Sequence, residues 1–175
     1  MTLEGVGVID FQLYLLKVMD PPASLLDSSL KKLNRTAAHM KDRHGVVSQL
    51  IRLGSGNARN LEIILKEAQV DSRGERGQWN VYQLPLWPDF KFSILLDQTG
   101  RFVEKMEFEQ CNDSEGVNQI APWRFLEADL AANFDQVRTI DGWGHYHTYN
   151  AQGFDREKYF LRFAWGLLQE IELIR

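Results

Sequence analysis

The hydrophobic residues of the chain change their spacing at Trp79, and this change constrains the fold more than any other feature of the sequence. In "DFKFSILLDQTGRFVEKMEFEQ" (89–110), apolar residues stand at every second position from 90 to 96, before the polar stretch 97–100, and Phe102, Met106 and Phe108 alternate with charged or polar neighbours after it. A period of two is typical of a strand with one buried face, and polar residues ending in glycine are typical of the turn between strands. The preceding "WNVYQLPLW" adds another strand. The sequence therefore predicts an antiparallel meander of at least three strands that includes residues 79–109.

Helical spacing precedes and follows this meander. Apolar residues recur at intervals of three and four over 24–43, 122–134 and 155–173, with Pro122 suited to a first helical position and Asp155 to an N-cap. These segments are predicted to be helices. Strands combined with such helices favour the α+β class, in which helices cover one face of an antiparallel sheet. At 175 residues the chain has the length of one domain, and we predict a single α+β domain over residues 1–175.

Three stretches leave alternatives open. Residues 8–18 fit a strand or a short helix, which ends at the prolines of "DPP". Residues 46–70 also fit both classes; we favour a short apolar element, a plain turn at "GSG" (54–56) and a helix near 60–68. The turn lacks the lysine that a phosphate-binding P-loop needs. "DSRGERGQ" (71–78) is predicted to be a loop.

The single cysteine limits the chemistry. With Cys111 alone, no intramolecular disulfide can form and a zinc site built on thiolates lacks its ligands, which fits a reducing compartment. Glu4 and Asp10 stand where a positively charged leader would be needed, so neither a signal peptide nor a membrane span is indicated. We expect a soluble cytoplasmic protein with no membrane partner and no cofactor.

Charge is unevenly distributed along the chain, whose formal net charge is −4. Basic residues dominate between 31 and 76, and acidic residues dominate between 89 and 135. The acidic part can be an interaction face for a basic partner or simply a set of solvated faces. The basic segment "LKKLNRTAAHMKDRH" (30–44) can contact phosphates, but the overall pI near 5.6 opposes the approach of nucleic acid. Nucleic-acid binding is therefore disfavoured.

The stretch "GWGHYHTYN" (142–150) concentrates aromatic and histidine side chains. If it is an extended strand, Trp143, His145, His147 and Tyr149 point to one side. Two histidines on one face can ligate a metal, with Asp141 as an available third ligand. Because no spacing identifies a further ligand, we favour an aromatic strand or loop that forms part of a binding surface, and we predict no bound metal.

No catalytic motif of high specificity is present. Cys111 as a nucleophile with His145 or His147 as its base is an alternative, but the acidic neighbours of the thiol discourage the thiolate. The carboxylates of "VEKMEFEQ" (103–110) lie at alternate strand positions without the cleft that a glycosidase needs. A solvated strand face is the simpler interpretation, and the chain is more consistent with a binding protein than with an enzyme.

One segment resembles a known family. "LWPDFKFSILLDQTGRFVEKMEFEQ" (86–110), followed by a segment that contains Trp123, is similar to the sheet core of small bacterial immunity proteins that neutralise partner toxins in polymorphic or contact-dependent toxin systems. The likeness consists of an apolar strand, a short turn ending in glycine, and a strand that alternates aromatic and acidic residues. It covers 25 of the 175 residues.

The resemblance implies a non-enzymatic module that binds a cognate basic protein, such as a toxin domain, and occludes its active cleft. Two alternatives stay open: an enzyme, metal-dependent or metal-free, that uses His145 and His147, and a scaffold or chaperone-like interaction domain. The oligomeric state is also left open. The residues predicted to contact the partner are Glu104, Glu107, Glu109, Asp113, Glu115, Asp141, Trp143, Tyr146 and Tyr149.

Overall fold

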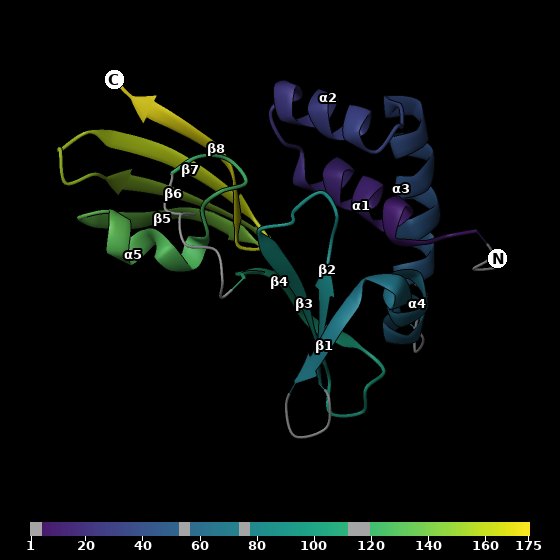
Figure 1. The fold of residues 1–175 in the computed structure, drawn as a ribbon. Helices are drawn as coiled ribbons and strands as arrows, with labels where there is room; N and C mark the ends of the chain where they lie inside the picture. The colour runs from purple at the N-terminus through teal and green to yellow at the C-terminus, as the bar shows by residue number, and fades with distance from the viewer. Residues whose placement is uncertain (1–4, 53–56, 74–77, 112–119) are drawn as a thin grey trace. The chain divides into compact units, whose positions relative to one another are not determined.

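The structure, a computed structural model, describes residues 5–52, 57–73, 78–111 and 120–175. The chain divides into two compact units, Met1–Met106 and Glu107–Arg175. Two four-stranded antiparallel sheets, with strand orders β1-β2-β3-β4 and β5-β6-β7-β8, accompany the helices (Figure 1). The predicted α+β class with an antiparallel sheet is confirmed. A single domain over residues 1–175 stays a prediction.

The N-terminal unit begins with helices. They are α1 (Val8–Met19), α2 (Ala23–Lys32), α3 (Ala37–Arg52) and α4 (Asn57–Leu65), followed by the 3-10 turn η2 (Lys66–Ala68). The helix expected over 24–43 is two helices, because Asn34 adopts the left-handed conformation (φ 53°) and ends the first. The turn expected at 54–56 lies outside the described residues. No helix in the described part of the chain is long and apolar enough to cross a membrane.

The first sheet contains the predicted meander. Its strands are β1 (Gln69–Arg73), β2 (Trp79–Gln83), β3 (Phe90–Leu96) and β4 (Val103–Gln110). The expectation of a loop from residue 71 was wrong for 71–73, which pair with 79–81. In the β3–β4 turn, the backbone N–H groups of Phe102 and Arg101 donate to the carboxylate of Asp97 and, with the Thr99 hydroxyl, hold its pKa at about 2. Phe11 of α1 packs edge-on against Phe92, with ring centroids 5.7 Å apart.

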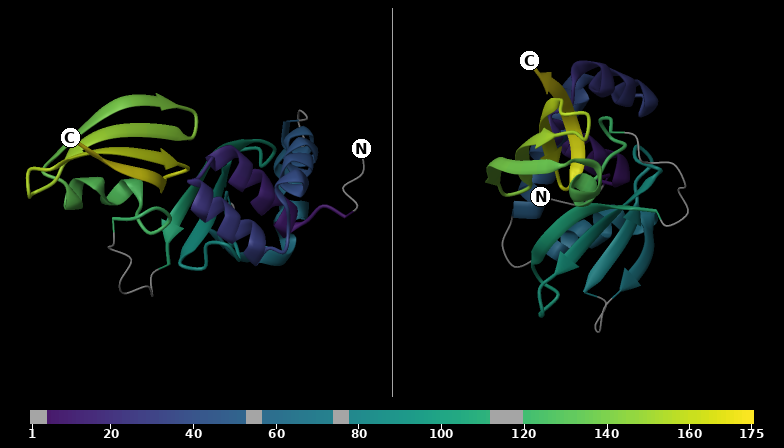
Figure 2. Two further views of the ribbon diagram at one scale, coloured as in Figure 1. Left: turned by 90° about the horizontal axis from the view of Figure 1, so that it is seen from above. Right: turned by 90° about the vertical axis from the view of Figure 1, so that its left-hand side faces the viewer.

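The C-terminal unit is a sheet with a short helical segment on one face (Figures 1 and 2). Its elements are η3 (Glu127–Asp129), α5 (Leu130–Asn133), β5 (Gln136–Trp143), β6 (Tyr146–Gln152), β7 (Lys158–Ala164) and β8 (Leu167–Ile174). We call residues 125–134, which contain η3 and α5, the helical segment. Its residues Phe125, Leu130 and Phe134 pack on residues of β6 to β8, among them Leu161 and Phe163. This apolar cluster fixes one face of the sheet.

The predictions of a helix over 155–173 and of a helix over 122–134 were wrong. Residues 155–173 form the hairpin β7–β8, because Trp165 and Gly166 both have positive φ and build a tight turn in the middle of the expected helix. Asp155 accepts the N–H of Glu157 within a loop and caps no helix. Of 122–134, only 130–133 is α-helical, since Trp123 is left-handed and Leu126 forms a bridge with Leu167.

Candidate functional site

The stretch 142–150 forms the tip of the β5–β6 hairpin, not one continuous strand. Gly144 and His145 make its two-residue turn, and Gly144 has the positive φ (61°) that the first position of such a turn requires. Trp143 is paired with Tyr146, so these two rings share a face. The expectation that Trp143 and the two histidines point to one side was wrong, because the turn resets the alternation.

A hydrogen-bonded cluster lies on the other face, beside the helical segment. The Glu127 carboxylate lies 2.8 Å and 3.0 Å from Nδ1 of His147, and it accepts the Tyr149 hydroxyl at 2.5 Å. An ionised carboxylate can only accept, so Nδ1 of His147 carries a proton, and in the neutral form of the ring Nε2 is the acceptor. Burial, followed by this bond to Glu127, raises the pKa of Tyr149, which keeps its hydroxyl a donor.

This arrangement orients His147 as a base or as a ligand through Nε2. The carboxylate of Glu127 is already engaged by two donors, and it is 23% exposed. Within the described residues, no group of three or more His, Cys, Asp and Glu side chains is placed to hold a metal ion. His147 and His145 do not converge on a shared site with Asp141, which lies on the opposite face from His147.

His145 has a different environment. Its ring stacks on Trp165, with centroids 4.0 Å apart and planes 7° apart, and its backbone carbonyl accepts the N–H of Trp165. Its Nε2 is buried and has no hydrogen-bond partner among the residues that the structure describes. Burial, and then the charge of His147, lowers the pKa of His145. Protonation would bury an additional N–H donor, so the structure favours the neutral ring.

The lowered pKa of His145 predicts a loss of stability in acid. An unfolded histidine binds a proton near pH 6.5, and the folded His145 binds it only at lower pH. Acid therefore favours the unfolded state once the pH falls below about 6.5. In thermal melts between pH 7.5 and 5, we expect His145→Phe, which keeps a ring against Trp165, to lose less melting temperature than the unmodified protein. Equal losses would contradict a role for this histidine.

The other predicted residues are dispersed. Asp141 and Trp143 share the open face of β5 and β6 with Tyr146. Glu107 and Glu109 lie on β4 in the C-terminal unit, and Glu104 belongs to the N-terminal unit. Asp113 and Glu115 lie outside the described residues. Cys111 is half-buried.

Glu127 is the residue that the sequence did not identify as part of a site, although it lies within the acidic stretch 89–135. It stands 20 residues before His147 in the chain, and no spacing rule connects the two. The backbone of η3 is positioned by the β7–β8 turn, because the N–H of Glu127 donates to the carbonyl of Gly166 at 2.8 Å. The carboxylate therefore reaches the histidine only through a contact formed in three dimensions.

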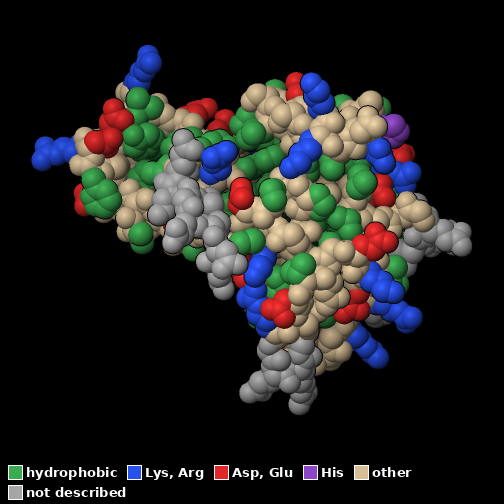
Figure 3. Space-filling view, viewed as in Figure 1, with side chains coloured by type: hydrophobic (Ala, Val, Ile, Leu, Met, Phe, Trp, Pro, Cys, Tyr) green, Lys and Arg blue, Asp and Glu red, His purple; other side chains and the backbone are tan. Residues whose placement is uncertain are grey.

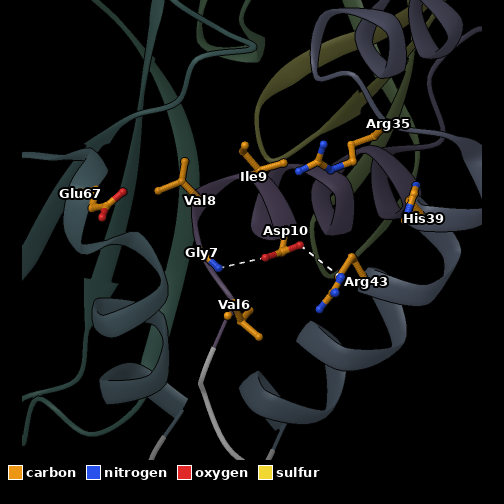
Figure 4. Close-up of a pocket in the computed structure, with 10 residues that line it drawn as sticks. Val6, Gly7, Val8, Ile9, Asp10, Arg35, His39, Arg43 and Glu67 are labelled. Atoms are coloured by element: carbon orange, nitrogen blue, oxygen red, sulfur yellow. Dashed lines mark hydrogen bonds and ion pairs between the residues drawn. The ribbon is translucent and has the colours of Figure 1, made fainter.

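The N-terminal unit holds a separate cavity of about 560 Å³ (Figure 4). Arg35, His39 and Arg43 line it at intervals of four residues, opposite the start of α1. Asp10 accepts the N–H of Gly7 and pairs with Arg43 at 3.4 Å. Because Glu67 adds a second carboxylate, the two arginines are balanced and the cavity has no net charge with His39 neutral.

No protein-family model, curated protein or solved structure matches the chain. The chemistry of its own side chains is therefore the basis for a function.

Proposed function

We propose that the chain is a non-enzymatic module that binds a protein partner through the face and edge of β5. The single observation that carries this proposal is the exposure of Trp143, whose surface is 80% accessible at the end of a strand in which every residue is exposed. Val137 and Ile140 are also exposed, by 39% and 50%. Exposed apolar side chains on a strand are common at interaction sites, and tryptophan is among the residues most enriched at the centres of such sites.

The backbone of β5 also supports a binding role. The strand is at one end of its sheet and pairs, among the described residues, with β6 alone. An outer edge of this kind can add a strand from a partner. The bulge at Ile140, between Thr139 and Asp141, interrupts the regular ladder and discourages open-ended strand addition. We therefore expect side chains, with Trp143 as the anchor, to supply more of the affinity than backbone pairing.

Charge indicates the chemistry of the partner. Residues 107–175 contain twelve Asp and Glu and six Lys and Arg, an excess of six negative charges. Hydrophobic and acidic side chains lie side by side on the surface of this unit (Figure 3). A basic partner fits this surface, and acidic residues would accelerate its approach. In the finer form of the proposal, the partner is a cognate toxin domain and the chain acts as an immunity protein that occludes its active cleft.

One observation favours an enzyme as the second candidate. The Glu127–His147 pair has the geometry of a base whose tautomer is fixed by a carboxylate. Against it, the same carboxylate binds Tyr149, and both bonds tie η3 to the sheet, which is a sufficient structural role. A scaffold or chaperone-like domain would use the β5 surface without any toxin.

The test begins with the protein encoded by the neighbouring reading frame, purified and measured by surface plasmon resonance. We expect Trp143→Ala to raise the dissociation rate about 30-fold, because a desolvated tryptophan anchor contributes about 2 kcal/mol. Asp141→Lys should mainly slow association, and low salt should enlarge the effect. Phe102→Ala, an exposed ring of the N-terminal unit, is the matched control and should change neither rate.

Two results would refute the proposal. One is tight binding that Trp143→Ala leaves unchanged. The other is absence of binding together with turnover of a small molecule that His147→Gln abolishes, which would establish the enzyme instead.

A further inference from the structure

A second cavity, of about 410 Å³, lies in the C-terminal unit. Three aromatic side chains line it, Phe134, Phe154 and Tyr159, and Ile120 and Ile171 complete its apolar wall. Its size is within the range of small-molecule sites. None of these side chains belongs to the Glu127 cluster or to β5, so the cavity is a separate feature. We refer to it as the aromatic cavity.

The rings of the aromatic cavity meet at steep angles. Phe134 and Tyr159 are 5.8 Å apart between centroids, with planes at 67°. Phe134 is buried and fixed in the core, whereas Phe154 is 70% exposed in the β6–β7 loop. The lining therefore combines two rings inclined to each other with a third, exposed ring. The face of an aromatic ring carries the negative part of its quadrupole and attracts a cation placed over it.

A carboxylate also belongs to the lining of the aromatic cavity. Asp155 lines the cavity, and its Oδ1 is held by the backbone N–H of Glu157 at 3.0 Å. This carboxylate approaches the backbone so closely that a Cβ on Gly153 would lie 2.5 Å from it, so the loop requires glycine there. The next residue in the sequence, Arg156, is basic, but it is not among the residues that line the cavity. The anionic group is thus built into the loop.

The ring of Tyr159 is polarised by the carboxylate of Glu157, which does not itself line the cavity. The Tyr159 hydroxyl donates to Glu157 at 2.8 Å, and this bond raises the pKa of Tyr159 to about 12. A phenol that donates to a carboxylate stays neutral and carries more electron density in its ring, which strengthens its attraction for a cation.

We propose that the aromatic cavity binds an alkylammonium group. The rings exclude water from the methyl or methylene groups of such a cation, and Asp155 faces its charge. An anionic ligand would meet the carboxylate of Asp155, and a neutral apolar ligand would gain nothing from it. The group can belong to a free quaternary amine or to a methylated lysine side chain, which present the same chemistry. This site is independent of the β5 surface.

The test is a titration of the full chain, followed by NMR, with choline and with its uncharged isostere 3,3-dimethylbutanol. We expect choline to shift the amide signals of Gly153 and Tyr159 and to bind about tenfold more tightly than the isostere. Phe154→Ala, a change at an exposed ring that should not disturb folding, should weaken choline binding about tenfold. Asp155→Asn keeps an oxygen for the Glu157 N–H and should weaken choline but not the isostere. Trp143→Ala is the control and should leave both affinities unchanged.

A peptide with one trimethyllysine distinguishes the two sources of the group. Tighter binding of the peptide than of choline identifies a protein side chain, and the reverse identifies a free small molecule. Equal affinity for choline and its isostere, no binding of choline or the peptide, or full binding by Phe154→Ala would overturn the proposal. Because choline is titrated without any protein partner, these outcomes do not depend on the β5 proposal and do not test it.

Discussion

Replacing Phe163 by alanine should destabilise the C-terminal unit by about 3 to 5 kcal/mol. Its ring is fully buried in the cluster between the sheet and the helical segment, where it contacts Phe125 with centroids 6.4 Å apart. Tyr149 rests edge-on against it at 5.8 Å. The variant therefore removes apolar burial and also loosens the support under the Tyr149–Glu127 bond.

The measurement must resolve the two units, since their unfolding can occur in separate steps. Hydrogen exchange of peptides from residues 120–175 reports the free energy of opening of the C-terminal unit, with peptides from residues 5–52 as an internal reference. The matched control is Phe160→Ala, on the same strand but on the opposite face. We expect it to cost about 1 kcal/mol or less, because Phe160 is only half-buried. Similar losses for both variants would mean that the helical segment does not define the buried face.

The first sheet could be predicted because its signals are local. In 90–96, the apolar residues at every second position are buried, together with Ser93, and the turn residue Asp97 is hydrogen-bonded to the backbone that follows it. A strand with one buried face that ends in a polar turn can be recognised from the alternation of its apolar residues and from its turn residues, all within about 20 residues of sequence. The prediction of 79–109 as an antiparallel meander depended on nothing more distant.

The second sheet could not be predicted in the same way. The apolar residues of 155–173 fit a helical stripe, and they also fit two short strands separated by a turn. The decisive residue is Trp165, which occupies a turn position where asparagine or glycine is expected. Gly166 is the local signal of a turn, but a single glycine is also tolerated within a helical pattern and does not decide between the two. The indole ring stacks on His145, a tertiary contact that accompanies the unusual conformation of Trp165.

The candidate site was also predicted only as far as its local sequence signals allowed. The histidines and aromatic residues of 142–150 were identified from their clustering, but the turn at Gly144 decided which of them share a face. Glu127 is held beside His147 and Tyr149 by the hydrogen bond from its backbone N–H to the carbonyl of Gly166 in the β7–β8 hairpin. Side chains brought together by tertiary contacts cannot be found from their spacing in one sequence.

Trp165→Asn separates the local preference of the β7–β8 turn from the packing that overrides it. The turn then reads Asn-Gly, the pair that best suits two consecutive positive φ values, and a strained φ of 48° is relieved by about 1 to 2 kcal/mol. The variant also removes an indole ring that is 5% exposed and stacked on His145, which costs about 3 to 5 kcal/mol. We therefore expect a net destabilisation of about 2 to 3 kcal/mol from an ideal turn sequence.

A second measurement identifies the cause of this loss. Without the indole, His145 becomes more accessible to water, and its lowered pKa should rise towards that of an ordinary histidine in an NMR titration. Trp165→Gly relieves the same strain and removes the same ring, so it should agree with Trp165→Asn in both measurements. Greater stability in either variant would show that turn strain exceeds the contribution of the ring. An unchanged His145 pKa would show that Trp165 does not shield this histidine, because burial is the main cause of its shift.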